Sequence, residues 1–191
     1  MELNKEMTAQ ESLQLITETF NKSRKGILRN SAKYFMLWGS LLTVTSLVIY
    51  LLWHFTGKPQ WNFLWFAMPA IGYPVAALMG KYNVAVPQNE VSKMLSGVWS
   101  VFGAFAITLS VLSMCLVPMH VTLIIALILG LSECFSGVLL KNWPIIICGF
   151  LLGVGGAVFS MLVLKDAQLL IFTLGGVLLV VTGFVMKLQN K

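Results

Sequence analysis

Residues 22–55 read KSRKGILRNSAKYFMLWGSLLTVTSLVIYLLWHF, and this stretch decides the fold. Basic residues lead into an apolar run from Tyr34 to Trp53 that contains no charged side chain. The run is long enough to cross a hydrocarbon layer of ~30 Å at ~1.5 Å per residue. Basic residues beside the first span usually set its orientation, so we expect the amino terminus to lie in the cytoplasm.

The whole chain has the composition of a membrane protein. Of its 191 residues, 58% are hydrophobic and only 10% are charged, whereas soluble domains have roughly 25% charged residues. Six apolar runs predict six spans, at about 34–54, 61–80, 95–117, 119–140, 144–164 and 167–186. We therefore predict an all-α fold: a bundle of six transmembrane helices over residues 34–187, followed by a short tail, 188–191.

The lysines and arginines support one orientation. Six spans with the amino terminus inside place all but two of these residues, Lys58 and Lys165, on the cytoplasmic side. This bias predicts that both termini lie in the cytoplasm. It also explains the net charge of +6 through membrane orientation and anionic lipid, without direct binding of nucleic acid.

Residues 1–33 predict a cytoplasmic amphipathic helix. Thr8 and Glu11 have the spacing of a capping box, and Gly26 could form a hinge before the first span. At about 100° per residue, one face is apolar; it contains Leu13, Ile16, Phe20 and Ile27. The opposite face is basic and contains Lys22, Lys25, Arg29 and Lys33. Such a helix can contact anionic lipid or dock on a soluble partner, and the sequence leaves both open.

Glu133 is the one acidic or basic residue well inside a predicted span, ~12 Å along the helix from Lys141. A charge in the bilayer is costly, so such a residue usually faces the bundle interior or water. Glu133 could load and release a proton, or it could be a protonated or hydrogen-bonded residue that joins two helices. Residues at comparable depth on other spans are candidate partners; they are Tyr73, Ser100, Cys148 and Thr182.

Two spans contain residues that interrupt helices. Pro69, Gly72 and Pro74 predict a kink or break in the second span. The fifth span has glycines at 153, 155 and 156, and interrupted helices at matching positions of inverted halves would indicate a transporter site. A kinked packing helix is the alternative. Small residues also recur every fourth position in the third span, at Ser96, Ser100, Ala104 and Thr108. They predict close helix contacts within the chain, with a homo-oligomer as the alternative.

Several short motifs occur together along the chain. They are Glu11-Ser12-Leu13, Leu37-Trp38-Gly39, Val98-Trp99, the run from Ser136 to Lys141, and Pro144 with Gly149. In this order they resemble a family of small six-span membrane proteins of the Bacteroidota, known as hypothetical proteins and often encoded beside small winged-helix regulators. The resemblance implies a protein of the bacterial inner membrane with a signalling or envelope-related role and no catalytic residues. The family's fourth span has an uncharged residue where this chain has Glu133, so the resemblance assigns that carboxylate no role.

The sequence contains no HExxH, GxSxG, P-loop or paired carboxylates, and its three cysteines form no CxxC pair. We therefore predict no enzyme activity, cofactor or metal site. The leading prediction is an integral membrane protein that acts through protein or lipid contacts, with a soluble cytoplasmic regulator as its partner. The alternative is a small proton-coupled transporter or channel that uses Glu133.

Overall fold

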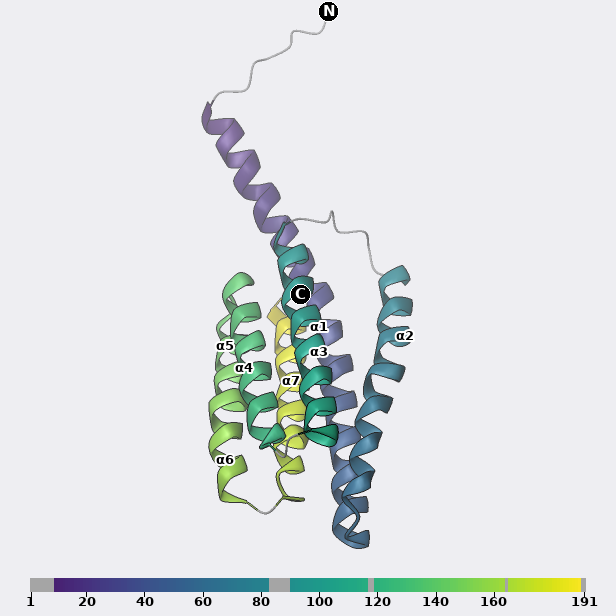
Figure 1. Cartoon of the computed structure of the whole chain (residues 1–191). Helices are drawn as coiled ribbons and strands as arrows, with labels where there is room; N and C mark the ends of the chain where they lie inside the picture. Colours follow the sequence, from purple (N-terminus) through teal and green to yellow (C-terminus); the bar gives the residue numbers. More distant parts are fainter. Residues whose placement is uncertain (1–8, 83–89, 117–118, 164, 190–191) are drawn as a thin grey trace, which may run out of the picture.

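The computed structural model describes residues 9–82, 90–116, 119–163 and 165–189 (Figure 1). Six helices in these ranges are long and apolar enough to cross a membrane. They are Gly26–Thr56, Pro59–Lys81, Val91–Cys115, Val121–Leu139, Trp143–Leu162 and Leu169–Leu188. The all-α fold is confirmed, and the chain is a polytopic membrane protein.

The first element, α1, is a single helix from Ala9 to Thr56. It passes through Gly26 without a break, so the predicted hinge there is wrong, and the amino-terminal helix and the first span are one element. A glycine inside a helix costs only about 1 kcal/mol relative to alanine. Ile27 and Leu28, which follow it, are buried in the bundle, and this contact fixes the helix directly after the glycine. Thr8, the predicted cap, lies outside the described residues.

The second span begins with the 3-10 helix η1 (Pro59–Phe66), and α2 (Ala67–Tyr82) continues it. Helix α2 includes Pro69, Gly72 and Pro74, so the predicted break is absent there and the irregular segment precedes it. Pro69 lies in the first turn of α2, where a backbone N–H often has no partner within the helix. Pro74 lies inside the helix, as prolines of membrane helices often do.

The third span is α3 (Glu90–Cys115), and the fourth is α4 (Val121–Leu139). The small residues of α3 are exposed, so the prediction that they pack within the chain is wrong. Two of their hydroxyls explain why no neighbour is needed: Ser100 donates to the Ser96 carbonyl and Thr108 to the Ala104 carbonyl, both at 2.8 Å. The hydroxyls of Ser100 and Thr108 are thus satisfied by the backbone of α3 itself.

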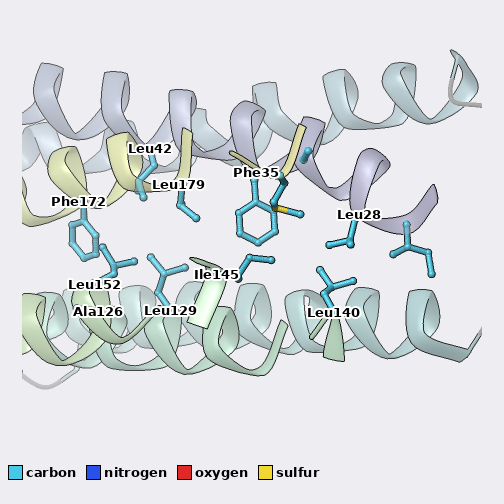
Figure 2. Packing of buried hydrophobic residues seen from close by; sticks show 13 residues of the cluster. Leu28, Phe35, Leu42, Ala126, Leu129, Leu140, Ile145, Leu152, Phe172 and Leu179 are labelled. Carbon is cyan, nitrogen blue, oxygen red and sulfur yellow. The ribbon is translucent and has the colours of Figure 1, made fainter. Parts of the chain in front are cut away.

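The fifth span consists of three segments: α5 (Trp143–Phe150), the π-helix η2 (Leu151–Gly155) and α6 (Gly156–Leu162). The interruption lies at the predicted glycine cluster. The last helix is α7 (Leu169–Gln189). Helix α1 packs along α7, and α4 packs along α5, η2 and α6. Buried apolar side chains fill the space between these two groups (Figure 2), while α2 and α3 bury few residues.

Candidate functional site

Glu133 lies on the buried face of α4 with an exposed fraction of 0%. The buried positions of this helix recur every three or four residues, which defines one stripe along the helix. They are Ala126, Leu129, Gly130, Ser132, Glu133, Ser136 and Gly137. All are small or apolar except Glu133, which is therefore the one acidic or basic group that α4 turns toward the bundle interior.

Both oxygens of the Glu133 carboxyl are buried, and no described residue makes a hydrogen bond of ordinary geometry with them; the one polar interaction of the carboxyl is with the Cys148 thiol. The thiol of Cys148, on α5, lies beside it, and the hydroxyl of Thr182, on α7, lies beside that thiol in turn. A thiol is a weak hydrogen-bonding group. Three helices thus meet at a carboxyl that is shielded from bulk solvent and has no strong hydrogen-bond donor beside it among the described residues.

The hydroxyls on the same face of α4 do not serve the carboxyl. Ser132 donates to the Ile128 carbonyl at 2.8 Å, and Ser136 donates to the Ser132 carbonyl at 2.7 Å. Such bonds to the preceding turn satisfy a serine inside a helix and use its one proton. The carboxyl therefore receives no hydrogen bond from its own helix.

This geometry fixes the charge state of Glu133. Removing a carboxylate from water without a counter-ion costs several kcal/mol. No basic side chain in the described ranges forms an ion pair with it. The neutral acid avoids most of this cost, so this arrangement of the helices favours the uncharged form of Glu133.

Of the four candidate partners of Glu133, Cys148 lies beside the carboxyl, and one of the other three lies close to the site. Thr182 approaches through Cys148, whereas Tyr73 packs edge-to-face on Trp38 with ring centroids 5.4 Å apart. Ser100 faces away from the bundle on α3 and is exposed. None of the three hydrogen-bonds the carboxyl.

Gly72 has a packing role against α1. A Cβ atom at this position would lie 2.5 Å from the indole ring of Trp38, so the absence of a side chain lets α2 approach α1. The residues predicted to contact lipid or a partner all belong to α1. Arg29 is exposed and Lys33 is half-buried, while the side chains of Lys22 and Lys25 lie outside the described residues.

A polar contact that the sequence did not predict joins the far end of α1 to the turn before α7. His54 Nδ1 lies 2.8 Å from Asp166 Oδ2, and the Tyr50 ring stacks on His54 with centroids 5.5 Å apart. The hydrogen bond with His54 lowers the pKa of the Asp166 carboxyl below its usual value. No local sequence pattern predicts a contact between two residues this far apart in the chain.

Among the described residues, no three His, Cys, Asp or Glu side chains lie close enough to hold a metal ion. The chain matches no protein-family model, no curated protein and no solved structure. The buried carboxyl and the helices around it are therefore the basis for a functional hypothesis.

Proposed function

We propose that this membrane protein is a small proton-coupled transporter in which Glu133 takes up and releases the proton. The observation that carries the proposal is a fully buried carboxyl whose one polar neighbour among the described residues is a weakly hydrogen-bonding thiol. A glutamate that served only to join helices would be expected to donate or accept a hydrogen bond, as buried polar groups generally do. Ionisable residues inside membrane spans are instead typical of proton relays and ion pathways.

The surrounding helices support the same interpretation. Cys148, beside the carboxyl, lies in α5, which ends where the π-helix η2 begins. Short π-helical segments inside α-helices are frequently found at functional sites. Interrupted helices around a site within the membrane are also a feature of transporters. The chain thus combines a buried titratable group with an irregular helix beside it.

The proposed cycle follows from the charge state. The closed bundle holds the neutral acid, and the carboxylate becomes stable only when water reaches it. Proton release must therefore accompany a rearrangement that hydrates the site. A substrate that favours one arrangement of the helices over the other would be coupled to the proton in this way.

The test is proton movement in liposomes that contain the purified protein and a pH-sensitive dye. A pH gradient is imposed with and without an extract of small bacterial metabolites as the source of substrate. We expect the protein to carry protons in at least the second condition, and Glu133→Gln to abolish this flux while the protein still elutes as a folded species. Asp166→Asn is the matched control, because it removes an acid outside the spans. Flux that persists in Glu133→Gln would refute the proposal.

A second function, docking of a soluble regulator, is favoured by the shape of α1. The helix begins at Ala9, whereas the span begins at Gly26, so it extends ~25 Å beyond the span at ~1.5 Å per residue. Leu13 and Leu15 in this extension are 69% and 54% exposed, and Figure 1 shows the extension projecting from the bundle. A helix that continues the span is better placed to meet a soluble protein than to lie flat among lipid headgroups.

The resemblance to six-span proteins encoded beside winged-helix regulators suggests the class of this partner, and a cytoplasmic amino terminus would expose α1 to it. Affinity purification of the tagged protein from its native membrane tests this function. We expect a stoichiometric soluble protein with the full chain, and its loss when residues 1–21 are deleted from a protein that still inserts. A partner that survives the deletion would show that the docking surface lies elsewhere.

A further inference from the structure

We propose that the bundle moves as two rigid helix pairs, α1 with α7 and α4 with α5–α6, and that the seam between them opens when Glu133 loses its proton. This inference rests on the proposed transport function, because it names the motion that would hydrate the site. It depends on how the helices touch within each pair and between the pairs.

Within the first pair, the backbones of α1 and α7 are in direct contact. A Cβ atom at Gly39 would lie 2.7 Å from the carbonyl oxygen of Gly176, and one at Gly176 would lie 2.6 Å from the carbonyl oxygen of Gly39. Further along, a Cβ atom at Gly183 would lie 2.8 Å from the carbonyl oxygen of Ala32. Close contacts of this kind are a main source of helix association in lipid, where the hydrophobic effect is absent.

The second pair is held in the same way. A Cβ atom at Gly149 would lie 2.7 Å from both the carbonyl oxygen of Gly130 and the backbone nitrogen of Cys134. One at Gly137 would lie 2.8 Å from the backbone nitrogen of Ile146. The Cys134 thiol also donates to the Ile146 carbonyl at 3.5 Å. These contacts join α4 to the fifth span on both sides of Glu133.

The seam between the pairs is built differently, from the side chains of the buried cluster (Figure 2). Where a glycine faces the seam, it meets a side chain and not a backbone: Gly175 of α7 meets Leu152, and Gly156 of α6 meets the Cγ2 atom of Ile171. Side chains can change rotamer when helices shift, whereas backbones in contact cannot yield. The seam is therefore where the bundle separates at least cost.

Glu133 lies at this seam. Its titratable neighbours are the thiols of Cys134 on α4 and Cys148 on α5, and across the seam α7 presents the neutral hydroxyl of Thr182. Among the described residues, α1 adds no charged group to the interactions of this carboxyl. An ionised Glu133 would thus be an uncompensated charge in an apolar seam, and separation of the pairs would let water reach it.

The native cysteines report on this motion. Cys148 lies at the seam beside Glu133 and is buried, Cys134 lies within the second pair, and Cys115 is exposed at the end of α3. The full chain in lipid nanodiscs is treated with a small membrane-permeant maleimide at a series of pH values, and mass spectrometry measures the modification of each cysteine. We expect the rate at Cys148, relative to Cys115, to rise with pH by up to about tenfold per unit, the limit for one linked proton.

Two comparisons separate the motion from ordinary thiol chemistry. Glu133→Gln should flatten the pH dependence at Cys148 to that of an isolated thiol. Cys134 is half-buried, and its rate relative to Cys115 should stay constant with pH because the second pair does not separate. If Cys148 and Cys134 become reactive together, the pairs are not rigid and the inference is wrong. It is equally wrong if the rise at Cys148 persists in Glu133→Gln.

The liposome assay distinguishes this inference from the proposed function. If proton flux depends on Glu133 but Cys148 never becomes reactive, the opening of the seam is refuted and proton transport is retained. If the reactivity of Cys148 rises in a Glu133-dependent way but no proton flux is measured, proton transport is refuted and the motion of the helix pairs is retained. Neither signal would overturn both.

Discussion

Replacing Gly39 with alanine tests the backbone contact that joins α1 to α7. The added methyl group would lie 2.7 Å from the Gly176 oxygen, 2.8 Å from the Leu179 Cβ atom and 2.9 Å from the Val180 nitrogen. Ordinary contact begins at 3.4 Å, so the two helices must move apart by about 0.7 Å, the difference between 3.4 and 2.7 Å. Two of the three atoms are backbone atoms and cannot rotate away.

The magnitude follows from what overpacking costs. Methyl groups forced into a close-packed interior typically destabilise by about 1–3 kcal/mol. Each kcal/mol lowers the melting temperature of a soluble domain of this size by roughly 2–4 °C. We therefore expect Gly39→Ala to melt several degrees below the wild type. The measurement is thermal unfolding in a mild detergent, followed by loss of the monodisperse peak in size-exclusion chromatography.

Gly97→Ala is the matched control, because a Cβ atom at Gly97 would have no neighbour within 4 Å. Alanine is also favoured over glycine in a helix interior, so this variant should melt at or slightly above the wild-type temperature. Equal melting temperatures for Gly39→Ala and Gly97→Ala would show that α1 and α7 are not in backbone contact. The rigid first pair would then have no basis.

Two further predictions concern contacts outside the seam. Gly72→Ala should destabilise the protein by about 1–3 kcal/mol, because the added methyl group would meet the Trp38 ring at 2.5 Å. Gly80→Ala is the control, since its methyl group would meet only the Tyr34 hydroxyl at an ordinary 3.6 Å. Thermal unfolding measures both variants, and equal melting temperatures would contradict the close approach of α2 to α1. Asp166 has a lowered pKa because of its hydrogen bond with His54, so its contribution to stability is present above the pKa of the unfolded state and is lost as the pH falls through the lowered folded value. Asp166→Asn should remove this loss of stability at low pH. It should also lower the stability at neutral pH by at most about 1 kcal/mol, since the pair is partly exposed. A pH profile of the melting temperature that is unchanged in Asp166→Asn would exclude the pair.

The six spans could be predicted from the sequence because length and hydropathy are sufficient to define a membrane helix. The predicted spans and the observed helices therefore coincide closely along the chain. The continuity of α1 through Gly26 was missed because it depends on burial of the neighbouring Ile27 and Leu28, which is a tertiary contact. The interruption of the fifth span was indicated by its glycines, although its π-helical form was not.

The site could be predicted only in part. The cost of a membrane charge placed Glu133 toward the bundle interior, and its exposed fraction of 0% agrees. Depth along a helix gives height in the membrane but not direction around the helix axis. Tyr73 and Ser100 therefore had the right depth but point elsewhere, while Cys148 at a comparable depth proved to be the immediate neighbour. The small residues of α3 were wrongly predicted to pack within the chain for the same reason, because their spacing defines one face of the helix but not what that face contacts.

A substitution to methionine separates the functional from the structural interpretation of Glu133. If the carboxyl served stability, removing it would weaken the bundle. The structure predicts the opposite, because an unsatisfied buried polar group costs about 1–3 kcal/mol, and apolar residues of similar volume often stabilise when they replace buried polar groups. We expect Glu133→Met to melt above the wild type and to carry no protons, with Ser132→Ala as a control on the same face of α4. Lower stability in Glu133→Met would mean that the carboxyl holds helices together, and the case for a proton site would fail.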